Sequence, residues 1–200
     1  MRDFILRARK GPSSADFSLD DLASAGHMEV VAHCIQNALF YSLNIRARVR
    51  VHIVLDGPAA PPKIVRIESD GLGSLGGFDE RALCGVLKDA LAAGRHLALA
   101  EEVEALQGVW VAKRSFESLV RQVSAAGAFY ALQKRGTDIR EVEFPEDAAF
   151  IFSDHLGMPK KADRFLTRLG AEPLSVGPKM LFASQCIALV HNELDRRGLP

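Results

Sequence analysis

The chain has 200 residues, of which 48% are hydrophobic and 25% are charged, and its 25 Lys and Arg residues balance 25 Asp and Glu residues. This composition is ordinary for a globular domain, and zero formal charge argues against a protein that binds nucleic acid by bulk charge alone. No stretch reaches the roughly 18 uninterrupted apolar residues of a membrane span, and the N-terminus lacks the long apolar run of a signal peptide. We therefore expect one domain over residues 1–200, in the cytoplasm, with no membrane segment.

The first half of the chain shows strands as β-branched or apolar runs between turn residues, and helices as apolar residues three and four apart. In chain order, the pattern predicts a strand at 4–8, a loop at 11–26, a helix at 28–42, strands at 49–56 and 63–69, and a helix at 79–93. The second of these two strands alternates with charged residues, which favours a place at a sheet edge. Asp79 is a plausible N-cap for the helix that follows it.

The second half continues the alternation. It predicts a strand at 108–113, a helix at 115–126, strands at 128–132 and 148–153, a helix at 159–169, a strand at 173–176 and a final helix. The first half of that final helix, residues 180–190, is apolar almost all the way round and directly follows Gly177 and Pro178. This pattern predicts a helix buried on every face.

Strands that alternate with helices predict an α/β fold with a largely parallel, buried sheet. In such sheets ligands bind beyond the carboxyl ends of the strands. The loops that follow Leu132, Ser153 and Val176 are therefore the places where a site is expected.

Residues Gly71 to Gly76 read Gly-Leu-Gly-Ser-Leu-Gly, a literal match to the dinucleotide-binding motif. The hypothesis that follows is an NAD(P)-dependent oxidoreductase that binds pyrophosphate at this loop. Its context is poor, because the preceding strand is charged and no acidic residue ends a strand about 20 residues further on. The alternative is a mobile glycine loop.

Other reactive residues have two interpretations each. Cys34, Cys84 and Cys186 are an odd number of widely spaced thiols, which predicts reduced, mostly buried cysteines and no zinc site. Asp154 and His155 follow a buried strand, where they either perform acid–base chemistry or cap backbone groups. His191 and Glu193 are a weak metal pair, and a solvated or interface helix end is the alternative.

Three blocks carry a resemblance to a known family. They are FILRARKGPSSADFSLDDLASAGHMEVVAHC (4–34), IFSDHLGMPKKADRFL (151–166) and LSVGPKMLFASQCIALVHNELDR (174–196). Together they resemble the TrmY family of pseudouridine N1-methyltransferases, which belongs to the SPOUT class. In this family the strand before the second block's DHLG often ends in Gly, whereas here it ends in Ser153. The resemblance covers essentially the whole chain.

The resemblance implies a SPOUT-type parallel sheet flanked by helices, with a C-terminal trefoil knot, and a homodimer joined at the knot. It implies S-adenosylmethionine as the cofactor, bound in a bent form between three loops. The implied reaction is N1-methylation of pseudouridine in RNA, with the TΨC loop of tRNA as the target. A knotted RNA-binding dimer without activity is an alternative within the same fold.

The resemblance also implies site residues. The cofactor would be held by the three loops and the turn beyond them, at Leu132, Gly157, Val176, Gly177, Met180, Leu181 and Cys186. Phosphates of the RNA would be held by Arg7, Arg9 and Lys10. No triad or metal is required, and Asp16, Asp20 and Asp154 are unranked candidates for a base that accepts the N1 proton.

Overall fold

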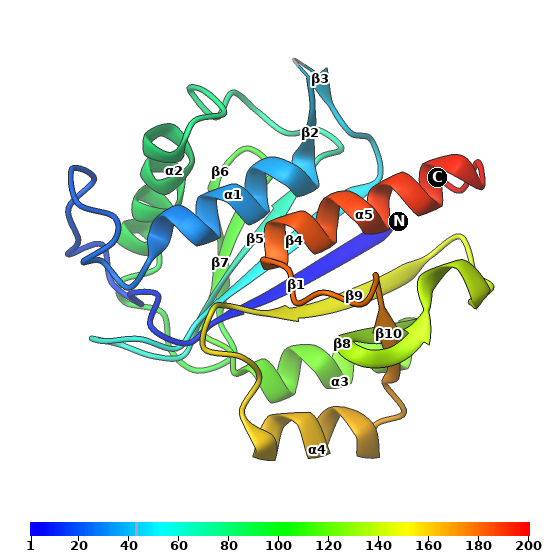
Figure 1. The fold of residues 1–200 in the computed structure, drawn as a ribbon. Coiled ribbons are helices and arrows are strands. Elements are labelled where there is room, and N and C mark those ends of the chain that lie inside the picture. Colours follow the sequence, from blue (N-terminus) through cyan, green and yellow to red (C-terminus); the bar gives the residue numbers. More distant parts are fainter. Residues whose placement is uncertain (43) are drawn as a thin grey trace.

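A computed structural model describes residues 1–42 and 44–200, and its centre is an eight-stranded sheet in the order β10-β8-β9-β1-β4-β5-β7-β6 (Figure 1). The strands of this sheet are β1 (Arg2–Ala8), β4 (Val49–Leu55), β5 (Lys63–Glu68), β6 (Glu102–Leu106), β7 (Val109–Ala112), β8 (Ala128–Asp138), β9 (Ala148–Ser153) and β10 (Glu172–Ser175). A separate antiparallel pair is formed by β2 (Phe40–Tyr41) and β3 (Asn44–Ile45).

The sheet has a parallel part and an antiparallel part. Strands β10, β8, β9, β1 and β4 pair in parallel with one another. Strands β5, β7 and β6 extend the sheet in antiparallel order beyond β4. The prediction of an α/β fold with a largely parallel sheet is confirmed.

Helices cover both faces of the sheet (Figure 1). They are α1 (Met28–Leu39), α2 (Glu80–Ala93), α3 (Phe116–Ala126), α4 (Lys160–Arg168) and α5 (Ala183–Arg196), with a short 3₁₀ helix, η1 (Ile139–Glu141). Helices α1, α2 and α5 lie on one face, and α3 and α4 lie on the other. None of the helices in the described part of the chain is long and apolar enough to cross a membrane.

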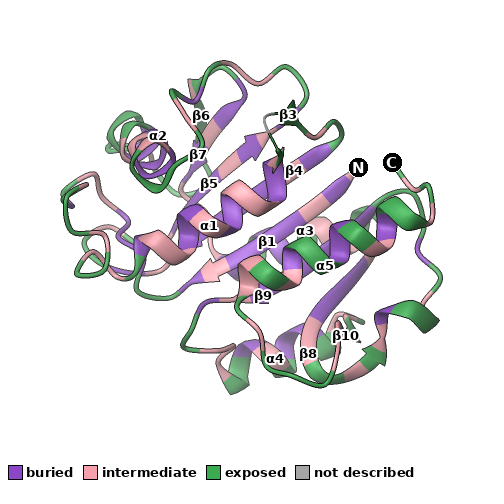
Figure 2. Cartoon of the chain, turned by 45° about the horizontal axis from the view of Figure 1, so that its top comes forward, coloured by how far each residue is buried: buried purple, intermediate pink, exposed green. Residues whose placement is uncertain are grey.

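The core is divided between the two faces because successive side chains of a strand point in opposite directions. In β1, Phe4 and Leu6 pack with residues of α1 and α5, whereas Ile5 packs with residues of α3 and α4. Figure 2 shows this as buried strands between helices, of which α1 has only buried and half-buried residues and the others carry exposed residues on their outer faces.

Local signals set several helix boundaries. The side chain of Asp79 accepts a hydrogen bond from the Ala82 N–H, so the predicted cap is present, and the side chain of Ser115 caps α3 in the same way through the Ser118 N–H. Gly170, with φ of 89°, follows the last turn of α4. The predicted helix over 28–42 ends at Leu39 instead, because the chain turns into the β2–β3 pair.

The antiparallel part differs from the prediction. Strand β5 is not at an edge: it lies between β4 and β7, and β6, which the sequence pattern did not indicate, forms the edge. The charges of β5 are tolerated inside the sheet because they meet opposite charges across the strands. Arg66 forms ion pairs with Glu68 and with Glu102 of β6.

The C-terminal helix was predicted to be buried on every face, and this is wrong for the single chain. Ile187, Val190 and Leu194 of α5 are buried, whereas Gln185 and Leu189 on its other side are exposed. The helix therefore has apolar residues, such as Leu189, that packing within one chain does not bury.

His191 of α5 is not a solvated helix end either. It is 1% exposed, its Nε2 donates to the Ala38 carbonyl (2.9 Å), and its Nδ1 lies 2.6 Å from Nη1 of Arg2. Burial lowers the pKa of His191 to about 3, and the nearby cations Arg46 and Arg2 act in the same direction. His191 is therefore a neutral core residue that joins α5 to α1 and β1.

Candidate cofactor and RNA site

The carboxyl ends of the parallel strands define one edge of the sheet, and the loops of the candidate site are at this edge. Strands β1, β4 and β9 end together, since Ala8 pairs with Leu55 and Arg7 pairs with Ser153. The segment after β9 and the segment between β10 and α5 both leave the sheet here. This is the position at which open parallel sheets bind ligands.

The first predicted loop begins inside a strand. Strand β8 does not stop at Leu132 but continues to Asp138. Its pairing with β10 shifts between Ala131 and Thr137, so residues 132–136 form an irregularity rather than a free loop. A Cβ at Gly136 would lie 2.5 Å from the Leu174 backbone, so the glycine allows this close approach. Leu132 is half-buried at the start of the irregular segment.

The third predicted loop lies against the same irregularity. The Ser175 hydroxyl lies 3.3 Å from the Lys134 carbonyl, and the Gly177 N–H donates to Ser175 Oγ (3.3 Å). Ser175 thus joins Lys134 in the irregular segment to Gly177 at the start of the third loop, although Lys134 and Ser175 are 41 residues apart. Within this segment Val176, Gly177 and Leu181 are half-buried, and Met180 is 77% exposed.

The second loop is tied to the end of β1 by Asp154. Its Oδ2 accepts from the Arg9 N–H (2.7 Å), and its Oδ1 accepts from the Leu156 N–H (3.0 Å). The side chain is buried, and the Gly157 N–H donates to the Asp154 carbonyl (3.0 Å). Both carboxylate oxygens therefore fix backbone, which favours the capping interpretation of Asp154 over a free base.

The glycines of the second and third loops face open space. Gly157 has φ of 71° and Gly177 has φ of 142°, and a Cβ placed on either would meet no atom within 4 Å. Exposed backbone groups of such loops suit the polar edge of an adenine ring. These loops fit an adenosine-containing cofactor in the sense that they leave space and polar backbone at one edge of the sheet.

The thiols supply no nucleophile. Cys34 is fully buried, and burial, together with the nearby Cys186 and Asp154, raises its pKa. Burial also raises the pKa of Cys186, which lies in the first turn of α5, half-buried. All three cysteines are free, as predicted, and among the described residues no group of three His, Cys, Asp or Glu side chains could hold a metal ion.

The three basic residues predicted to hold phosphate do not behave alike. Arg9 and Lys10 are exposed at the end of β1. Arg7 is largely buried: its Nε donates to Asp56 (2.7 Å), and its guanidinium carbon lies 4.4 Å from the centre of the Phe116 ring. Of these three residues, Arg9 and Lys10 present their charges to solvent and Arg7 does not.

The turn before α1 was missed by the sequence interpretation. His27 has φ of 63°, its Nδ1 lies 2.8 Å from Oε1 of Glu29, and its ring meets the His155 ring edge-on at 4.5 Å. The available signal was the Gly-His-Met-Glu sequence at 26–29, in which a histidine precedes a helix at the place of a cap. The structure places this histidine beside the second loop.

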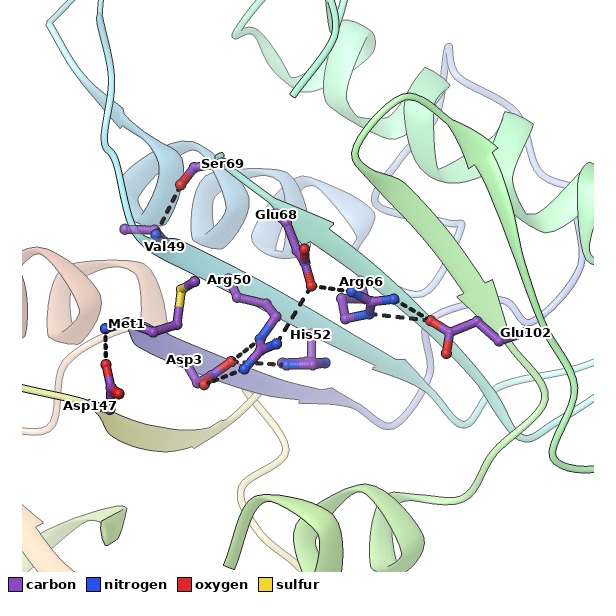
Figure 3. A network of polar contacts seen from close by, with 10 residues as sticks. All are labelled: Met1, Asp3, Val49, Arg50, His52, Arg66, Glu68, Ser69, Glu102 and Asp147. Carbon is purple, nitrogen blue, oxygen red and sulfur yellow. Dashed lines mark hydrogen bonds and ion pairs between the residues drawn. The ribbon is translucent and has the colours of Figure 1, made fainter. Parts of the chain in front are cut away.

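A cavity of about 290 Å³ lies elsewhere, beside α3 and near the starts of β1, β4, β8 and β9. Its polar wall is the network in Figure 3, in which Arg50 pairs with Asp3 through two hydrogen bonds (2.5 and 2.9 Å) and His52 lies 3.1 Å from Asp3. Burial alone would raise the pKa of Asp3, but the hydrogen bonds from Arg50 and His52 outweigh it and hold the pKa at about 2. We assign this paired network to the stability of the sheet.

The glycine hexamer also lies at the wrong edge for a cofactor. Strand β5 runs antiparallel to β4, so Gly71 to Gly76 follow its end near the start of β4. The segment is held there by the Gly73 N–H, which donates to the Gln107 carbonyl (3.0 Å), and by the Gln107 side chain, which donates to the Gly71 carbonyl (3.0 Å). In a dinucleotide fold the motif instead follows a strand of the parallel part of the sheet.

The chain was compared with known proteins. Over residues 1–199 it matches a family model described as "Putative SAM-dependent RNA methyltransferase". It is 38% identical over 197 residues to a Vibrio cholerae protein named "Putative pseudouridine methyltransferase", with 98% of each chain covered. Proteins of the same name from Photobacterium profundum (39% over 195 residues, 98% of each chain) and Shewanella frigidimarina (37% over 197 residues, 98% of this chain and 100% of that protein) are similar.

Among solved structures, the fold is similar to that of Archaeoglobus fulgidus Nep1 bound to S-adenosylhomocysteine. The TM-score is 0.60 over 97% of this chain and 96% of that chain, at 11% sequence identity. This likeness shows that the two chains share one α/β fold, a mostly parallel sheet flanked by helices. The chain belongs to the family of S-adenosylmethionine-dependent RNA methyltransferases whose model it matches.

Family membership decides between the alternatives. The cofactor is S-adenosylmethionine and the protein is an RNA methyltransferase, as the resemblance implied. The oxidoreductase hypothesis based on Gly71 to Gly76 is wrong, in agreement with the place of that loop at the opposite edge of the sheet.

Proposed function

We propose that this enzyme transfers the methyl group of S-adenosylmethionine to N1 of a pseudouridine in RNA, and that its target is the TΨC loop of tRNA. The observation that carries the proposal is the whole-length similarity to proteins named for pseudouridine methylation, at 37–39% identity. The resemblance of the 4–34, 151–166 and 174–196 blocks to the TrmY family supports the N1 position.

The proposed methyl transfer agrees with a carboxyl edge that offers neither a nucleophilic thiol nor a metal site among the described residues. When bound, S-adenosylmethionine supplies a methyl group on a positively charged sulfur. The ring nitrogen N1 attacks that carbon in one in-line displacement, so neither a covalent enzyme intermediate nor a metal is needed. The main task of the protein is to hold N1 and the methyl carbon in line, and to provide an acceptor for the N1 proton.

The cofactor residues are assigned within this proposal. Gly157 and the Val176–Leu181 segment would hold the adenosine part, together with Leu132 in β8 and Cys186 in the first turn of α5. Arg9 and Lys10 would hold phosphates of the RNA beside the same edge. The target base lies within folded RNA and would have to leave its stack to reach this edge.

Knot and dimer are proposed together. Strand β10 pairs with β8 in the sheet, and the chain then crosses to the other face, where α5 packs on α1 (Figure 1). A trefoil knot at this crossing, within a single domain of residues 1–200, is the arrangement we propose. The exposed Met180, Phe182 and Leu189 would then form the contact with a second copy of the chain. We place the enzyme in the cytoplasm, where its three thiols would stay reduced.

Methylation of matched RNAs tests the function. Two hairpins with the TΨC-loop sequence, one with pseudouridine and one with uridine at the target, are incubated with the protein and S-adenosylmethionine, then digested to nucleosides for mass spectrometry. We expect N1-methylpseudouridine from the first hairpin and no methylated nucleoside from the second. Methylation of uridine or of a ribose hydroxyl would contradict the proposal.

A further inference from the structure

The turn Gly26–His27 is held against the end of β1 in an unusual backbone conformation. Both residues are left-handed, with φ of 75° and 63°. A Cβ on Gly26 would lie 2.1 Å from the Lys10 carbonyl oxygen, so this turn is fixed on the segment that leaves β1. A residue other than glycine in this conformation is uncommon, and such residues gather at functional sites.

The side chain of His27 does not serve the helix that it precedes. A Ser, Asp or Asn at this position would cap α1, but the His27 side chain makes no capping hydrogen bond. It is turned instead toward Glu29, with Nδ1 2.8 Å from Oε1. The His27 carbonyl accepts from the Val30 N–H (3.1 Å) at the start of α1, whereas the imidazole is directed to Glu29.

The Glu29 contact decides which ring nitrogen carries the proton. An ionised carboxylate only accepts hydrogen bonds, so Nδ1 of His27 is the donor and Nε2 keeps its lone pair. The same arrangement, a carboxylate that fixes the tautomer of a histidine base, recurs in hydrolytic triads. The structure gives Nε2 no hydrogen-bond partner among the described residues, and the side chain is 46% exposed.

His27 lies at the carboxyl edge of the sheet. Its ring packs edge-on against His155, which lies between Asp154 and Gly157 in the second candidate cofactor loop. Helix α1 begins near the end at which β1, β4 and β9 finish (Figure 1). The imidazole of His27 therefore lies beside a loop that would hold the cofactor in the proposed function.

The carboxylates considered from the sequence are less suited to the task. Both oxygens of Asp154 accept backbone hydrogen bonds, and the side chain is buried. Asp20 forms an ion pair with Arg81 (2.5 Å). Asp16 is exposed in the 11–26 segment, and its N–H donates to Ser14 Oγ (3.4 Å).

We propose that His27 is the general base that removes the N1 proton of the target pseudouridine, with Glu29 as a positioning residue; this inference rests on the function proposed above. Nε2 of His27 takes the proton, and the N1 electron pair forms the bond to the methyl carbon. The carbon–sulfur bond breaks, its electrons stay on sulfur, and S-adenosylhomocysteine leaves as a neutral thioether. The imidazolium, next to Glu29, returns the proton to solvent.

The test compares single-turnover methyl transfer to the pseudouridine hairpin by the wild type and by His27→Asn. Asn tolerates the left-handed conformation but accepts no proton at neutral pH. We expect the rate to fall by roughly 10²-fold or more, which is the usual contribution of a general base. Affinities for S-adenosylhomocysteine and for the hairpin should stay within about twofold of wild type, which would also show that the variant is folded.

His33 offers a matched control on the same helix. It lies 2.6 Å from Glu80 and is also 46% exposed, so His33→Asn breaks a similar pair away from the second loop. Its rate should equal that of wild type. Glu29→Gln, which no longer fixes the tautomer of His27, should lose at least about tenfold in rate with unchanged cofactor affinity.

The pH profile separates a base from a structural residue. Glu29 on α1 and His155 on the second loop are the titratable groups that the structure places against the His27 ring. The wild-type rate should rise with pH and then level off, and the His27→Asn rate should lack this step. A His27→Asn enzyme that keeps the wild-type rate and pH profile would overturn this inference alone. The same holds if its affinity for S-adenosylhomocysteine falls by as large a factor as its rate. A wild-type protein without activity on pseudouridine would overturn the proposed function and this inference with it.

Discussion

Gly177 lies between β10 and α5, with a positive φ and open space on the side where a Cβ would lie. If the cofactor's adenine occupies that space, Gly177→Val should abolish binding of S-adenosylhomocysteine in a protein that still folds. We expect at least a 100-fold weaker affinity by calorimetric titration, equivalent to about 2.7 kcal/mol.

The control is Gly170→Val, at the end of α4. Gly170 also has a positive φ (89°), and a Cβ at this position would meet no atom within 4 Å, so the variant carries the same backbone strain without a predicted ligand. It should bind the cofactor normally. Equal affinities of the two variants would remove the 176–181 segment from the site.

Arg9 and Lys10 are the exposed cations at the end of β1, whereas Arg7 is paired with Asp56. Arg9→Glu combined with Lys10→Glu should weaken RNA binding about tenfold or more, because phosphate contacts release bound counterions. The slope of log K against log salt should decrease in magnitude by about two.

The same charge change on α4, Arg164→Glu with Arg168→Glu, serves as the comparison, since both residues are exposed. An equal loss of affinity in both double variants would mean that RNA responds to overall charge and not to the end of β1. Arg7→Glu is unsuitable as a probe, because it would place a second carboxylate against Asp56 inside the fold.

At the scale of elements, the contact between α5, α1 and β1 predicts a sensitivity to acid. The pKa of His191 in the folded state is about 3, below its ordinary value of 6.5, because burial and the cations Arg46 and Arg2 oppose its charge. The unfolded chain therefore binds this proton first as pH falls. The contribution of neutral His191 to the free energy of unfolding is fully present above about pH 6.5. It decreases as pH falls toward 3, by up to roughly 1.4 kcal/mol per pH unit.

Urea unfolding of His191→Gln between pH 4.5 and 7.5 measures this effect. Gln does not titrate, so the variant should lose stability less steeply with acid than wild type, whatever its stability at neutral pH. Burial also lowers the pKa of His52, which therefore contributes to the slope of both proteins. The exposed His96 provides the control: His96→Gln should keep the wild-type slope, and a His191→Gln slope equal to that of wild type would contradict the prediction.

The elements that the sequence predicted are those whose signals are local. Asp79 and Ser115 cap helices through their own side chains, and the apolar runs of β1, β4 and β9 are buried wherever the sheet places them. The position of β5 depends on neighbouring strands. The charge of Arg66 alone predicts an exposed edge strand, but in the sheet it is paired with Glu102 of β6. The extension of β8 to Asp138 likewise depends on β10, which arrives more than 30 residues later.

At the scale of the whole molecule, the exposed apolar side of α5 predicts a dimer. Leu189→Glu would place a charge in the proposed contact and should shift the protein to monomer in sedimentation velocity at micromolar concentration. Leu99→Glu is a matched change, because Leu99 is 73% exposed on the segment after α2. It should leave the assembly unchanged, and a wild-type protein that is already monomeric would exclude this contact.

The candidate site was predictable in outline and not in detail. The order of strands and helices placed three loops at one edge, and the structure joins Lys134 of the first to Ser175 at the start of the third. The contribution of His27 was not predictable, because it depends on a left-handed turn held by Lys10 and on a neighbour, His155, that is distant in sequence. The withdrawal of Arg7 from the surface depends in the same way on Asp56.

The two edge strands of the open sheet bear on how the protein behaves at high concentration. An unpaired edge is a template on which another molecule can add a strand, and aggregation begins at such edges. Here β6 presents Glu102 and Glu104 as exposed residues, and β10 carries Glu172 beside Pro173, which has no N–H to offer. The like charges on β6 and the missing N–H donor on β10 disfavour edge-to-edge pairing of sheets from different molecules. Self-association is therefore expected through the apolar side of α5 instead.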